Sequence, residues 1–453
     1  MARLSCSALF LFSAGAGCAL IAAGCSYKVV EDGRVNREAV RQLVETVAEI
    51  RGLPQTRPLK VALESPALLR QRAERDARDQ RRSADLDRQR LVWGKLGLID
   101  VTADLVDAYG KLTSEAPYGY YDTGDQVLRI VARPLMRSEV LELVSALRGR
   151  DVVAGEILSH EVCHALQDMA YDLDRLHAEA PDDDARLALQ ALVEGDAGLV
   201  SFLYAASFFQ DYESWVEFLR RRVAHAFAVA GVPDYLNARL QFPYLAGGLF
   251  VAALYRSGRF AAIDETYRQL PLSTELILHP EIRATAAAAP VAVALPPWPE
   301  TAGEVVLGED TLGEFGLRTM FARNAPGIDA AQAAAGWGGD RYRVVQQADG
   351  TLGLQWATRW DSVHDARQFC DAYRAMTRRG DRDLIEAVSG TSFHYRAGRD
   401  LRVVIDCAGD AVDVAETMGD PRTAELLQQM AAARAMPRSA PGTRPRTMPE
   451  TLP

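Results

Sequence analysis

The sequence predicts an α+β protein, with a mainly helical first domain that carries a small sheet and a smaller α+β second domain with an antiparallel sheet. Apolar residues recur every three or four positions between residues 153 and 171, and helical patterns continue from 185 to 256. Short strand-like segments gather beyond residue 303. Between the two regions, four prolines among residues 290–299 predict a linker over 290–302.

Residues 1–24 predict a signal peptide of the lipoprotein type. Arg3 supplies a positive charge, and residues 4–24 contain no charged side chain. The run Leu-Ile-Ala-Ala-Gly before Cys25 resembles a lipobox, so we expect cleavage before Cys25 and acylation of its sulfur. A membrane-spanning anchor and acylation at Cys18 are the alternatives. Residues 25–36 then form a tether, and Ser26 is typical of an outer-membrane lipoprotein that faces the periplasm or the cell surface.

The net charge argues against a nucleic-acid partner. The formal charge is −10, and removal of residues 1–24 takes away only the charge of Arg3, which gives −11. Nucleic-acid binding requires basic surfaces. The expected partners are therefore a peptide or protein substrate and the membrane, through the lipid anchor. The sequence leaves the oligomeric state open.

The first domain is expected over residues 37–289, and several local patterns precede its central motif. Residues 36–51 are typical of an amphipathic helix and 59–64 of a strand, whereas the mixed charges of 66–95 indicate a solvated helix. Residues 118–131 predict a hairpin. Its outer edge either pairs with an extended substrate backbone or is an ordinary sheet edge.

The most informative motif is His160-Glu161-Val162-Cys163-His164, which has the pattern HExxH. On a helix, His160 and His164 lie one turn apart, so both imidazoles can bind one zinc ion. Glu161 then lies beside the water that the zinc ion activates and is predicted to act as the general base. Two surface histidines on an ordinary helix are the alternative. The apolar residues around the motif argue against it, because they place this helix in the core.

A zinc hydrolase needs a third protein ligand. The metzincin pattern would require Gly at 167 and His at 170, where this chain has Gln167 and Ala170. Gluzincins instead take a glutamate from a second, downstream helix. Glu194 follows His164 by 30 residues, which is enough chain for an antiparallel return, so we predict it as the third ligand.

Supporting residues are predicted around these ligands. A ligating histidine usually gives its other N–H to a carboxylate or a carbonyl, and Asp196 and Asp168 are the candidates for that role. Hydrolysis of an amide also needs a donor for the oxyanion that develops on the attacked carbonyl. His279 is the first choice and Tyr244 the second, both on chain expected to be irregular, with a capping or packing role as the alternative for each.

The motifs resemble those of a group of exported bacterial and archaeal metallopeptidases of the gluzincin type. The similar segments are residues 157–168 (Ile-Leu-Ser-His-Glu-Val-Cys-His-Ala-Leu-Gln-Asp), 192–197 (Leu-Val-Glu-Gly-Asp-Ala), 119–122, 242–248, 271–280, 335–342 and 360–361. The resemblance covers most of residues 40 to 415 and implies a zincin-like domain and a hydrolytic reaction, but no substrate. Met169 departs from the glutamine usual in the group. Asp196 follows the glutamate by two residues, unlike the four of thermolysin-type gluzincins.

The second domain is expected over residues 303–419. Helical patterns over 311–324 and 362–378 alternate with strand-like ones over 341–347, 353–358 and 401–406. Cys370 and Cys407 are candidates for a disulfide in an exported protein, although the sequence does not supply their geometry. Cys163 is expected to be a small buried residue. Residues 431–453, which are rich in Pro, Arg, Thr and Ala, are predicted to be disordered.

The function predicted from these observations is that of a zinc-dependent metallopeptidase that hydrolyses peptide bonds in the cell envelope. One alternative is a catalytically silent envelope lipoprotein whose zincin fold binds other proteins, which the presence of Glu161 disfavours. The other is a zinc amidase that acts on cell-wall material and shares the same metal site.

Overall fold

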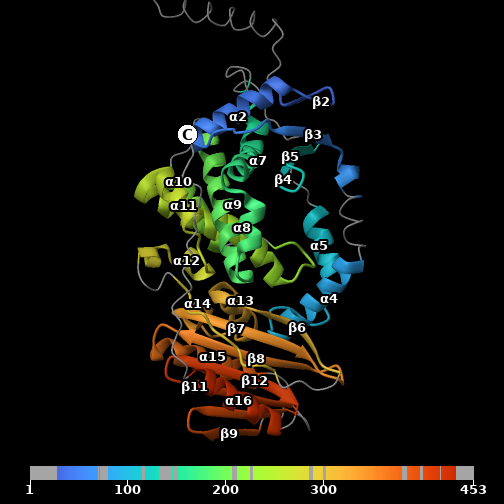
Figure 1. Cartoon of the computed structure of the whole chain (residues 1–453). Coiled ribbons are helices and arrows are strands. Elements are labelled where there is room, and N and C mark those ends of the chain that lie inside the picture. Colours follow the sequence, from blue (N-terminus) through green and yellow to red (C-terminus); the bar gives the residue numbers. More distant parts are fainter. Residues whose placement is uncertain are drawn as a thin grey trace, which may run out of the picture.

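The structure, a computed structural model, is an α+β protein with a helical part at one end and a seven-stranded sheet at the other (Figure 1). It describes residues 28–69, 71, 80–114, 118–131, 145, 151–206, 212–224, 228–284, 289–298, 303–379, 385–397, 401–418 and 420–434. The predicted signal peptide, Cys25 and residues 435–453 of the predicted tail lie outside this part of the chain. Residues 431–434 were expected to be disordered, and this was wrong: the helix α16 (Asp420–Arg434) includes them, and Arg434 pairs with Asp406 and Asp413.

The N-terminal helix α2 (Arg37–Arg51) begins at Asn36, whose side chain accepts hydrogen bonds from the first turn. Its apolar stripe is buried, and it lies beside α7 (Figure 1). The residues before it differ from the predicted tether, because β1 (Val30–Glu31) and β2 (Arg34–Val35) form a short antiparallel pair. Val29 is buried, and its N–H donates to Asp151 at 3.2 Å.

A small sheet follows, with the order β3-β5-β4. Its strands are β3 (Lys60–Glu64), β4 (Gly119–Asp122) and β5 (Val127–Val131). The antiparallel pair β4–β5 is the predicted hairpin, and β3 runs parallel to β5. The helices α4 (Gln80–Lys95) and α5 (Leu105–Ser114) lie in the chain between β3 and β4. Within the part of the chain that the structure describes, β4 is therefore an edge strand, and it contacts the helix α7.

The centre of the helical part consists of α7 (Val152–Tyr171), α8 (Leu173–Glu179), α9 (Asp183–Ala206), α10 (Tyr212–Ala224) and α11 (Asp234–Arg268). Within α9, Asp183–Ala205 has the length and apolar composition of a membrane span, but 72 % of its most apolar window is buried inside the fold, as expected of a core helix.

Glycines allow α9 and α11 to approach very closely. A Cβ atom on Gly195 of α9 would lie 2.3 Å from the carbonyl oxygen of Gly247, and one on Gly247 would lie 2.1 Å from that of Ala191. Both distances are far below van der Waals contact, so the two helices touch through their backbones at this level. Gly195 follows Glu194 directly, and the contact therefore lies beside the predicted metal ligand.

The C-terminal part contains an antiparallel sheet with the order β6-β7-β8-β12-β11-β10-β9. Its strands are β6 (Val305–Asp310), β7 (Trp337–Gln346), β8 (Leu352–Trp360), β9 (Ile385–Ser389), β10 (Ser392–Ala397), β11 (Leu401–Ala408) and β12 (Ala411–Met418). Its helices are α13 (Gly313–Asn324), α14 (Ala330–Ala334), α15 (Val363–Arg379) and α16 (Asp420–Arg434). Val414 and Ala415 of β12 pack in different core clusters, which indicates that both faces of the sheet are covered. A disulfide joins Cys370 of α15 to Cys407 of β11.

The two parts share one apolar core, which extends from α9 and α11 into β7, β8 and α15. α12 (Thr274–Leu278) and the 3-10 helix η1 (Pro280–Ala284) lie between them in the chain. Residues 289–298, where a linker was predicted, pack on the second part instead. The Val291 N–H donates to the Gly338 carbonyl at 2.6 Å, and Trp298 is buried.

The start of α9 is fixed by contacts with the C-terminal part. Asp182 accepts a hydrogen bond from Thr311 at 3.1 Å, and the Asp183 N–H donates to Asp310 at 2.9 Å. Asp184 is buried and accepts two hydrogen bonds from Thr274, at the start of α12. The C-terminal part therefore holds one end of the helix that carries Glu194.

Candidate metal centre

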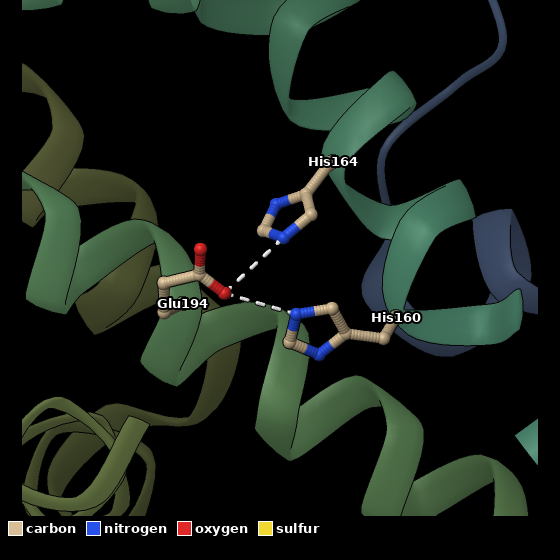
Figure 2. A group of neighbouring side chains, drawn as sticks. All are labelled: His160, His164 and Glu194. Atoms are coloured by element: carbon tan, nitrogen blue, oxygen red, sulfur yellow. Dashed lines mark hydrogen bonds and ion pairs between the residues drawn. The ribbon is translucent and has the colours of Figure 1, made fainter. Parts of the chain in front are cut away.

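Three side chains from two antiparallel helices converge at one point (Figure 2). His160 and His164 are one turn apart on α7, and both project toward Glu194 of α9. Oε2 of Glu194 lies 3.0 Å from Nε2 of His160 and 3.3 Å from Nε2 of His164. The side chains are 13–17 % exposed, so the centre lies at a surface that solvent reaches.

The donor atoms fit a zinc ion. Zinc in proteins is bound by histidine nitrogen and carboxylate oxygen at about 2.0–2.2 Å in a tetrahedron, whose corners are then about 3.3 Å apart. The two nitrogen–oxygen distances match that spacing, and the three ligand atoms all lie within 4.8 Å of one another. Three protein ligands leave the fourth position for water, as catalytic zinc sites require.

The local electrostatics favour a charged carboxylate facing the imidazoles. Burial alone would raise the pKa of Glu194, but His164 and His160 hold this pKa well below its usual range. Burial alone would lower the pKa of His164, yet Glu194 and the hydrogen bonds of the ring raise it to about 9. The carboxylates of Glu194 and Glu161 therefore favour positive charge at the His164 ring.

Glu161 is held by the edge strand of the small sheet. Its Oε2 accepts a hydrogen bond from the backbone N–H of Tyr121 at 2.9 Å. Tyr120, the preceding residue of β4, pairs with Arg129 of β5, so the N–H of Tyr121 points away from the sheet and toward α7. The outer edge of β4 therefore lies next to the predicted general base.

The predicted partners of the histidines differ from the observed one. Nδ1 of His164 lies 2.9 Å from Oε1 of Gln167, a residue that the sequence analysis did not propose. Asp196 lies one hydrogen bond further away, since it accepts from Nε2 of Gln167 at 2.9 Å. Gln167 is three residues after His164 on α7 and thus on the same helix face, which is the pattern that could have revealed it.

Asp168 contacts the edge strand β4 instead of a histidine. It accepts hydrogen bonds from the Tyr121 hydroxyl at 2.8 Å and from Arg57 at 2.6 Å. Burial, together with Asp168, raises the pKa of Tyr121 to about 12. Asp168 therefore fixes β4 against α7, and it acts on the centre through the strand that holds Glu161.

The structure separates the two candidates for oxyanion stabilisation. Tyr244 stacks on the His160 ring with a centroid distance of 6.1 Å, and burial of its hydroxyl together with the carboxylates of Glu194 and Glu161 raises its pKa, although the residue as a whole is 45 % exposed. His279 instead contacts Glu314 and Arg318 of α13, each at 3.1 Å. Tyr244, the second choice, therefore lies at the centre, whereas His279, the first choice, is bound to α13.

Tyr244 was expected on irregular chain, and this expectation was wrong. Residues 242–244 lie inside α11, although Pro243 removes one helical hydrogen bond. Packing of α11 against α9 outweighs that loss, and it brings Tyr244 to the metal ligands.

Comparison with known proteins gives one match. Residues 303–428 match the model of a family described as a domain of unknown function (DUF8575). Searches of curated proteins and of solved structures find no match. The matched region comprises β6 to the first half of α16, and thus the part of the protein that holds the start of α9.

Proposed function

We propose that this protein is a zinc-dependent metallopeptidase with a zincin-like helical domain. The observation that carries the proposal is the convergence of His160, His164 and Glu194 on one point, with Glu161 on the next position of the same helix. A silent binding protein would not need a carboxylate beside the ligands. Its position next to the strand β4, whose Tyr121 N–H donates to it, supports hydrolysis.

Each residue has a distinct task in the proposed reaction. A bound zinc ion would polarise the attacked carbonyl and lower the pKa of water. Glu161 takes a proton from the attacking water and passes it to the leaving amine. The Tyr244 hydroxyl is the donor for the negative charge that develops on the carbonyl oxygen.

The surroundings of the centre support a polypeptide substrate. We infer that an extended substrate chain lies along β4 next to Glu161 and pairs with backbone groups other than the Tyr121 N–H, which donates to Glu161. Large apolar side chains are exposed nearby: Ile157 (37 %) lies one turn before His160 on α7, and Leu240 (41 %) lies one turn before Tyr244 on α11. We infer that the substrate places an apolar side chain beside the cleaved bond.

The disulfide supports export. Cys370 and Cys407 are bonded to each other, and such bonds persist in oxidising compartments outside the cytosol. An envelope location, with a lipid anchor at Cys25, is the proposal consistent with this bond and with the N-terminal sequence.

The test compares the processed protein with the Glu161→Gln variant. We expect about one zinc per chain in both, cleavage of a peptide library by the wild type only, and unchanged activity in Glu156→Gln, a matched change at an exposed position of the same helix. Zinc in both proteins without cleavage by either would favour the silent scaffold. Cleavage of cell-wall peptide bonds alone would favour the amidase, and absence of zinc from the wild type would refute the metal centre.

A further inference from the structure

A buried polar chain leads from the metal ligand His164 to the N-terminal helix. Its first link is the contact between His164 Nδ1 and Gln167 Oε1, at 2.9 Å. Gln167 is fully buried, and its Nε2 donates to Asp196 at 2.9 Å. Asp196 is fully buried as well, and its carboxylate lies 2.8 Å from Nε of Arg51, the last residue of α2.

The hydrogen bonds of Gln167 determine which end of its amide faces the histidine. Both acceptors near Nε2, the Val193 carbonyl and the Asp196 carboxylate, lie within 3.1 Å, and neither can donate. The NH₂ group must therefore face them, which turns the oxygen toward His164. An amide oxygen only accepts, so Nδ1 of His164 carries a proton. Nε2 is then the nitrogen whose lone pair is available to a metal ion.

Arg51 holds the far end of this chain of contacts in place. Its side chain is 0 % exposed, and it ends between Asp196 and Asp264, with the latter at 2.7 Å. The guanidinium also lies 4.8 Å above the centre of the Phe260 ring. The ion pair with Arg51 holds the Asp196 carboxylate in place, where it accepts from Nε2 of Gln167 at 2.9 Å. Arg51 thus positions the acceptor that orients the Gln167 amide.

We propose that Gln167, Asp196 and Arg51 are positioning residues that set the tautomer of His164 and thereby the affinity of the metal centre. The helix α2, which contains neither the HExxH motif nor residues 192–197, is then part of that centre. The inference rests on the proposed zinc binding but requires no catalytic activity. A purely structural role for the same residues would affect the stability of the fold and leave zinc affinity unchanged.

The test measures the zinc dissociation constant by competition with a chelator. Gln167→Met keeps the shape of the side chain and removes the acceptor, and we expect a loss of affinity of about 10- to 100-fold. The matched control is Gln355→Met, the same change at a buried amide of β8 in the C-terminal sheet, with affinity unchanged. The metal-free variants are compared by circular dichroism and thermal unfolding.

A double variant tests the chain of contacts itself. Arg51→Met weakens zinc binding if Arg51 acts through Gln167, and adding Arg51→Met to Gln167→Met then causes little further loss. If the losses of zinc affinity in the two single variants add up in the double variant, Arg51 does not act through Gln167, and the proposed chain of contacts is refuted. Unchanged affinity in Gln167→Met would overturn the proposal even if Arg51→Met does not fold. Either result leaves zinc binding and peptidase activity of the wild type intact, so failure of the relay is distinguished from failure of the proposed function.

Discussion

Replacement of Gly195 by alanine tests whether the contact between α9 and α11 sets the geometry of the metal centre. The added Cβ would lie 2.3 Å from the Gly247 carbonyl oxygen, whereas real contacts of this kind are rarely below 3.0 Å. The helices must therefore separate by at least about 0.7 Å at this level. Overpacking of this kind costs about 1–3 kcal/mol of folding free energy. It also shifts Glu194 and Tyr244, which lie on opposite sides of the contact.

The matched control is Gly198→Ala, one turn further along the same helix, where a Cβ would meet nothing within 4 Å. Alanine is favoured over glycine in a helix by up to about 1 kcal/mol, so this variant is expected to be as stable as the wild type or more stable. Thermal unfolding of the metal-free proteins measures the stability difference, and chelator competition measures zinc affinity. If Gly195→Ala is as stable as Gly198→Ala and binds zinc as tightly as the wild type, the contact does not define the centre.

Further predictions concern catalysis, specificity and stability. Tyr244→Phe is expected to retain zinc and to lower kcat by about 10²-fold, as for loss of one oxyanion donor; an unchanged kcat would exclude that role. Leu240→Asp is expected to raise KM for peptides with apolar side chains at the cleaved bond, measured with matched apolar and polar peptides. Burial near other acidic groups raises the pKa of Glu275 to about 9. Between about pH 4.3, the pKa of the carboxyl in the unfolded chain, and about pH 9, the folded protein keeps the carboxyl protonated whereas the unfolded chain has lost the proton. The free energy of unfolding therefore falls by up to about 1.4 kcal/mol for each unit by which the pH rises in this range. Glu275→Gln is expected to remove this loss, so that its advantage in unfolding free energy grows from pH 5 to pH 9; a difference independent of pH would contradict the shift. Serine at both Cys370 and Cys407 opens a loop with a sequence separation of 37 residues and is expected to cost about 4 kcal/mol, measured as a lower unfolding temperature than that of the oxidised wild type.

Local sequence patterns predicted those helices and hairpins well whose formation depends on their own residues and not on distant partners. The helix that carries HExxH was expected over 153–171 and extends over Val152–Tyr171, and the hairpin before it has the predicted strands. The spacing of His160 and His164 fixes their common helix face, and the return of the chain brings Glu194 opposite to them. These are consequences of helix periodicity and loop length alone.

Predictions that depended on distant partners were less accurate. His279 has a suitable side chain for catalysis, but Glu314 binds it, and that contact spans 35 residues. Pro243 suggested irregular chain because proline weakens isolated helices, whereas tertiary packing keeps α11 continuous there. The prolines of residues 290–299 similarly suggested a free linker, although Val291 pairs with Gly338. Arg51 gave no local indication, since its partners come from three other helices.

The start of α9 has a further consequence for the domain of unknown function. About 16 Å of rigid helix separates Asp183 from Glu194, at 1.5 Å per residue. The domain holds the first of these residues through Asp310, and the second lies in the centre. Residues 303–428 are thus attached to the first turn of α9, and Glu194, the predicted metal ligand, lies further along the same helix. Without this helix, the surface around Asp310 and Thr311 would be covered by a different element or exposed to water.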